Sequence, residues 1–161
     1  MRRAVGLLAA GVLLAGCGEP AVDVRLSPRE EGQQVLDQAG ILNGPDIARR
    51  LEGLRDGGLD VVALTYESEQ AGCGEAFRAG GEIVRIWDAD VAVVAVAEPG
   101  DFAAEADPRQ RCLGVRPRNA ELVPGGVRER IAEQLVPPIA ARNEWTDAFL
   151  VAIDAIAEAR Q

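Results

Sequence analysis

A thiol at position 17 is the residue most clearly placed for chemistry, because it ends the segment Leu14-Ala15-Gly16-Cys17. Two arginines open the chain, the apolar run Ala4–Leu14 follows, and small residues stand directly before the cysteine. These are the parts of a secretory signal, and a thiol at its cleavage point can be acylated before the signal is removed. We therefore expect residues 1–16 to be a lipoprotein signal peptide and Cys17 to be the lipidated first residue of the mature chain.

An ordinary signal peptide, cleaved near Ala15 with Cys17 incidental, is the alternative for this segment. The apolar run is too short for a membrane span, which needs about 20 residues. Two or more acyl chains would anchor the mature chain stably. Residue 18 is glycine and not the aspartate of an inner-membrane retention signal, so we expect a lipid-anchored, extracytoplasmic protein on the cell membrane or outer membrane.

The other two cysteines, Cys73 and Cys112, are expected to form a disulfide, because an exported chain meets an oxidising compartment. Cys73 follows the first buried strand of the predicted fold. Cys112 begins a third strand that is expected to return antiparallel, which places both thiols at the same edge of the sheet. A metal-binding pair or a reactive thiol is the alternative.

Three aspartates, Asp37, Asp88 and Asp90, are the candidate metal ligands. If all three lie at the start of neighbouring strands, their carboxylates share one edge of the sheet and suit a hard cation such as Ca²⁺. The alternative is that Asp37 caps a turn while Asp88 and Asp90 are solvated loop acids.

Two further charged clusters carry weaker signals. The acids Asp101, Glu105 and Asp107 lack calcium-loop spacing, so we interpret them as a solvated loop. Arginines alternate at two places in an extended region, which would put each pair on one side of a strand and suit an anion; the alternative is that they balance nearby acids. These are Arg109, Arg111, Arg116 and Arg118.

Composition excludes several classes of function. The formal charge is −9, and loss of Arg2 and Arg3 with the signal makes it −11, which argues against nucleic acid or an anionic lipid surface as a partner. The chain has no histidine, which excludes Ser-His-Asp and Cys-His catalysis and imidazole metal sites.

The elements that must position these residues alternate between strand and helix. Residues 17–33 contain prolines, glycine and charges without apolar periodicity and are predicted to be a tether. In residues 34–161, an extended segment at 35–42 precedes a helix to residue 56, a buried strand at 59–66 and a helix at 75–87. A second buried strand at 91–96, a short strand at 111–116 and a helix broken at Pro137-Pro138 follow, and Asn143 is expected to cap the last helix. The prediction is one α/β domain, a three-layer sandwich with a small mixed sheet of three to four strands and helices on both faces.

Three segments carry a resemblance to the TPM-domain family of small exported or membrane-attached α/β domains. Val35 to Leu42 matches the opening motif V-x-D-x-A-G-x-L, residues 88–93 are similar to the family's D-N-G-V-L-L strand entry, and residues 127–158 resemble its closing helix pair. The chain has Ala89-Asp90 where the family usually has Asn-Gly, and residues 116–126 match its glycine-rich loop poorly.

The resemblance implies one of two functions. The first is a non-catalytic module that binds or assembles with another envelope protein. The second is a metal-dependent acid phosphatase, because some family members are described as such, and it would use the acidic positions Asp37, Asp88 and Asp90. The lack of histidine and of a convincing carboxylate pair favours the binding module.

Overall fold

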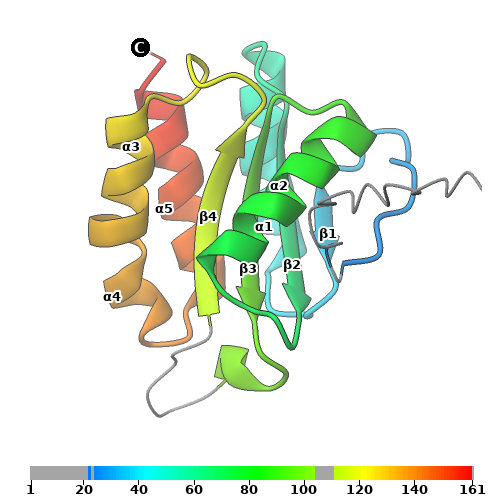
Figure 1. The fold of residues 1–161 in the computed structure, drawn as a ribbon. Helices are drawn as coiled ribbons and strands as arrows, with labels where there is room; N and C mark the ends of the chain where they lie inside the picture. Colours follow the sequence, from blue (N-terminus) through cyan, green and yellow to red (C-terminus); the bar gives the residue numbers. More distant parts are fainter. Residues whose placement is uncertain (1–21, 23, 104–110, 161) are drawn as a thin grey trace, which may run out of the picture.

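A four-stranded mixed sheet forms the centre of the molecule, with strand order β1-β2-β3-β4 (Figure 1). The computed structural model describes residue 22 and residues 24–103 and 111–160. The first three strands are parallel and the fourth is antiparallel to β3. The strands are β1 (Val35–Asp37), β2 (Val61–Glu67), β3 (Val91–Ala97) and β4 (Arg111–Pro117).

The two central strands are apolar on both faces because helices cover both sides of the sheet. Every residue of β3 is buried, as are the first six residues of β2. This is why their sequences are continuous apolar runs and do not alternate with polar residues. The predicted buried strands are therefore confirmed, with boundaries moved by one or two residues.

Helices lie in a layer on each side of the sheet. Helices α1 (Gly44–Asp56) and α5 (Trp145–Glu158) pack on one face, where Ile47, Phe149 and Ile153 are fully buried. Helix α2 (Cys73–Trp87) crosses the other face (Figure 1), where it contacts β3 and β4 and buries Ile83 and Trp87 in the core. The predicted three-layer α/β architecture is confirmed.

The helical segment beside β4 is interrupted before its two prolines. Helix α3 (Gly125–Arg130) continues into the wider turn η2 (Ile131–Leu135), and α4 (Pro137–Ala140) follows. The backbone N–H of Val136 donates to the carbonyl of Ile131, five residues back, at 3.0 Å. Widening this turn relieves the crowding that a proline ring causes with the carbonyl four residues before it, so the predicted break has a direct steric cause.

Asn143 does not cap the last helix, contrary to the prediction. Helix α5 begins at Trp145 with Glu144 in the capping position. Asn143 has a φ of 58°, a left-handed conformation that asparagine tolerates better than most residues. Its side-chain Oδ1 accepts a hydrogen bond from Arg111 at 2.6 Å. The residue thus ends the preceding turn and joins it to β4.

The predicted tether at residues 17–33 extends too far into the domain. Residues 24–33, here called the strap, lie against the sheet beside α2, and Val24 is buried with the core residues of that face. The Trp87 indole N–H donates to the Ser27 carbonyl at 2.9 Å. The Arg29 guanidinium pairs through two nitrogens with the Asp60 carboxylate and lies over the Trp87 ring. Residues 24–33 are therefore packed as part of the domain.

Candidate functional site

Asp37 holds together the turn that follows β1. Its Oδ1 accepts hydrogen bonds from the Ile41 N–H at 3.1 Å and from the Thr65 hydroxyl, and its Oδ2 accepts from the Leu42 N–H at 2.9 Å. Gly40 has a φ of 68°, which favours glycine, and so allows the chain to fold back over the carboxylate. The family-like motif around residues 35–42 is thus explained by a turn whose acid is engaged by the chain itself.

Asp88 and Asp90 lie between α2 and β3. Asp88 ends α2 in a left-handed conformation, and its carboxylate pairs with Arg118 at 2.6 Å. Asp90 accepts a hydrogen bond from the Asp60 N–H at 2.9 Å. This contact joins the segments that lead into β2 and β3.

The three aspartates do not share one edge of the sheet, contrary to the prediction. Asp37 pairs in register with Thr65, and Thr65 pairs with Ala95, five residues beyond Asp90. At about 3.3 Å per residue, Asp37 and Asp90 are about 16 Å apart along the strands. Within the described part of the chain, no group of three or more acidic, cysteine or histidine residues is arranged to hold a metal ion. Ca²⁺ binding stays a prediction. A single site built from all three carboxylates does not fit this arrangement.

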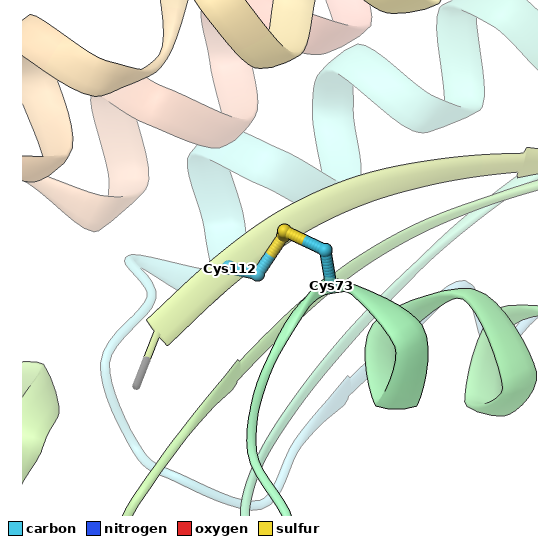
Figure 2. Close-up of a disulfide and its surroundings, with 2 residues drawn as sticks. All are labelled: Cys73 and Cys112. Carbon is cyan, nitrogen blue, oxygen red and sulfur yellow. A yellow bond between two sulfur atoms is a disulfide. The ribbon is translucent and has the colours of Figure 1, made fainter. Parts of the chain in front are cut away.

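The predicted pairing of Cys73 with Cys112 is confirmed, and Figure 2 shows the bond between the start of α2 and β4. The two Cα atoms are 5.1 Å apart. Cys73 is the first residue of α2 and Cys112 pairs in register with Val96 of β3. The reason is topological: β2 and β3 end at this edge and antiparallel β4 begins here.

A small apolar cavity of about 240 Å³ adjoins the disulfide, with Val136, Trp145 and Arg111 among its lining residues. The Arg111 guanidinium donates to the carbonyls of Asp101 and Ala140 and to Asn143, so the chain's own acceptors use it. Burial lowers the pKa of this guanidinium, and the nearby Asp101 carboxylate partly opposes that shift. Ligand pockets usually measure about 300–1,000 Å³, so this space suits packing better than a ligand.

A buried carboxylate at the start of α2 had no signal in the sequence. Glu75 is 2 % exposed, accepts a hydrogen bond from the Tyr66 hydroxyl at 3.0 Å and pairs with Arg78 at 2.7 Å. The Nε of Arg78 is itself buried without a partner in the described structure. A negative charge in the first turn of a helix is favoured by the helix dipole, and Arg78 balances it. This polar cluster ties α2 to β2 next to the disulfide.

The arginines at 116 and 118 do lie together, at the far end of β4. Both line a hollow of about 350 Å³ with Arg85 and Val84 of α2. Arg109, in contrast, lies outside the described residues, as do Glu105, Asp107 and the expected lipidation residue Cys17. The structure therefore keeps one of the two proposed arginine pairs as a candidate binding surface.

Fold and site together define a disulfide-linked α/β domain whose three candidate aspartates serve its own turns and an ion pair. Among the described residues, no helix is long and apolar enough to cross a membrane. Searches of known protein families and of curated proteins give no match to this chain.

Proposed function

We propose that this protein is a lipid-anchored, TPM-like module of the cell envelope that binds another envelope protein and has no catalytic role. The observation that carries the proposal is the engagement of its acidic residues. Asp37 holds a turn, Asp90 joins two strand entries, and Asp88 pairs with an arginine. Carboxylates already used by their own fold are poor candidates for a metal or a proton transfer, and this favours a binding surface over a catalytic centre.

The anchor is supported by the sequence Leu14-Ala15-Gly16-Cys17 and tested with the substitution Cys17→Ser. The parent chain is expected in the membrane fraction, with an intact mass that includes acyl chains. The variant should be released. A variant that stays with the membrane, together with a parent whose mass shows no lipid, contradicts the anchor.

Binding to an envelope protein is tested by cross-linking the anchored chain on intact cells and identifying the products by mass spectrometry. The expected result is one dominant partner whose cross-link is lost when excess soluble domain competes. A smear of unrelated products that competition leaves unchanged contradicts a specific partner.

A metal-dependent acid phosphatase is the other function that the resemblance implies, and the same purified protein tests it. Hydrolysis of a phosphate ester is measured at acidic pH with Ca²⁺, with Mg²⁺ and with a chelator. We expect no turnover above buffer. Metal-dependent turnover that Asp37→Asn abolishes, while the fold remains intact by circular dichroism, would overturn the binding proposal.

A further inference from the structure

The surface shared by α2 and β4 presents an arginine with unused hydrogen-bond donors. Arg116 extends from β4 across α2, and its Cζ lies 4.0 Å from the centroid of the Phe77 ring. In the described part of the chain, its guanidinium has this aromatic contact but neither a carboxylate nor a carbonyl partner. Phe77 is itself 45 % exposed, the most exposed of the large hydrophobic side chains in that part.

A glycine in α2, Gly80, leaves the space in which this arginine lies. A Cβ on Gly80 would stand 2.6 Å from the Arg116 Cβ, and one on Gly81 would stand 3.7 Å from its Nε. Glycine inside a helix is unfavourable relative to alanine. Gly80 thus opens a trough in α2 that receives the stem of the arginine side chain, while Phe77 contacts the guanidinium, so the side chain is ordered before any ligand arrives.

The charge around Arg116 is locally positive although the whole chain is acidic. Arg85 and Arg118 line the same hollow, and each already pairs with a carboxylate at 2.6 Å, namely Glu82 and Asp88. Three guanidinium groups therefore face two carboxylates, and the unmatched charge is that of Arg116. The two existing pairs also show which chemical group this surface accepts.

We propose that this surface, made by Phe77, Arg85, Arg116 and Arg118, binds an acidic segment of the partner protein, with one of its carboxylates on Arg116. The inference rests on the proposed function, because it names the surface through which the module binds. A planar guanidinium can bind a carboxylate through two parallel hydrogen bonds. Arginine and exposed aromatic residues carry much of the binding energy in protein interfaces, and a side chain that is already ordered loses less entropy on binding.

Fluorescence anisotropy with a labelled hexaglutamate peptide tests this surface, using the purified lipidated protein in zwitterionic detergent. Hexaglutamine is the uncharged control peptide. The substitution Arg116→Gln keeps the side-chain stem in the trough and removes the charge. Arg116→Lys keeps the charge but removes the planar guanidinium that can form two parallel hydrogen bonds. Arg50→Gln is the matched control, since Arg50 pairs with Asp154 on the opposite face of the domain.

The expected result is saturable binding of hexaglutamate and not of hexaglutamine, weakened about tenfold by Arg116→Gln, less by Arg116→Lys and not by Arg50→Gln. Equal affinity for the parent and Arg116→Gln, or no binding at millimolar peptide, overturns the proposal. Inorganic phosphate that displaces the peptide at lower concentrations than free glutamate does, at matched ionic strength, would assign the surface to phosphate instead. Neither result would contradict a partner identified by cross-linking. Each would show only that the partner does not bind through this surface.

Discussion

The two ends of the central sheet are held by different chemistry. At the end where β2 and β3 finish, a disulfide joins α2 to β4, and the buried Glu75 hydrogen-bonds to Tyr66. At the end where these strands start, the contacts include the partly exposed ion pair between Arg29 and Asp60. Redox state should therefore govern the first end and ionic strength the second, because salt screens the partly exposed Arg29–Asp60 pair more than a pair whose carboxylate is buried.

Loss of the disulfide should have the largest effect. With both Cys73 and Cys112 changed to alanine, we expect the free energy of unfolding to fall by about 4 kcal/mol, from the loop entropy of a 39-residue separation. Urea unfolding followed by circular dichroism measures this loss. The parent protein with a reductant should behave like the double variant. A loss below about 1 kcal/mol would show that this end does not depend on its covalent link.

Removing the buried charge at the same end should have the next largest effect. Glu75→Gln weakens the pair with Arg78 inside the domain, and we expect a loss of about 2 kcal/mol in urea unfolding. Glu82→Gln is the matched control in the same helix, since Glu82 pairs with Arg85 at an exposed position. That control should cost less than about 0.5 kcal/mol. Equal losses for the two variants would contradict a special role for burial at this end.

The two adjacent glycines of α2 lie between the two ends of the sheet. Replacing each with alanine distinguishes the effect of packing from that of helix propensity. Gly80→Ala should destabilise the protein by about 1 kcal/mol or more, because the new methyl group overlaps the Arg116 Cβ. Gly81→Ala has room for its methyl group and should stabilise by about 0.5–1 kcal/mol. Thermal melts of the two variants should therefore shift in opposite directions. Shifts of the same sign would contradict the trough in α2.

Breaking the strap contact should have the smallest effect on the whole domain and the clearest salt dependence. Arg29→Gln should cost about 1 kcal/mol at low salt, since the Arg29 and Asp60 side chains are 19 % and 21 % exposed. The loss should shrink in high salt, whereas the disulfide effect should not. Amide hydrogen exchange of residues 24–33 should speed up in this variant while β3 keeps its protection. If salt does not change this loss of unfolding free energy, the ion pair does not stabilise this end of the sheet.

The fold and the disulfide could be predicted because both follow from the order of the apolar strands. Val61–Leu64 and Val91–Val96 are continuous apolar runs, so two parallel buried strands and an antiparallel return fix where both cysteines lie. The shared aspartate edge failed for a local reason. Residues 35–42 suggested one extended segment that begins near Asp37, whereas β1 has three residues and Asp37 ends it.

Glu75 and the strap could not be predicted from local sequence. A glutamate in the first turn of a helix is usually solvated, and only Tyr66, nine residues earlier on β2, shows that this one is buried. The strap has the charges, the proline and the glycine that are typical of a linker. Its fixed position comes from Asp60 and Trp87, which are 31 and 58 residues from Arg29.

The strap also sets how far the domain can travel. With Cys17 as the proposed lipidated residue, seven Cα–Cα steps separate the anchor from Val24, the first buried residue in the described part of the chain. At most about 3.6 Å per step, this connection spans about 25 Å, which is less than the roughly 35 Å diameter expected of a domain of this size. A module connected this closely to its lipid would meet its partner by diffusing in the plane of the membrane. Its partner would therefore have to present its acidic segment close to the lipid surface.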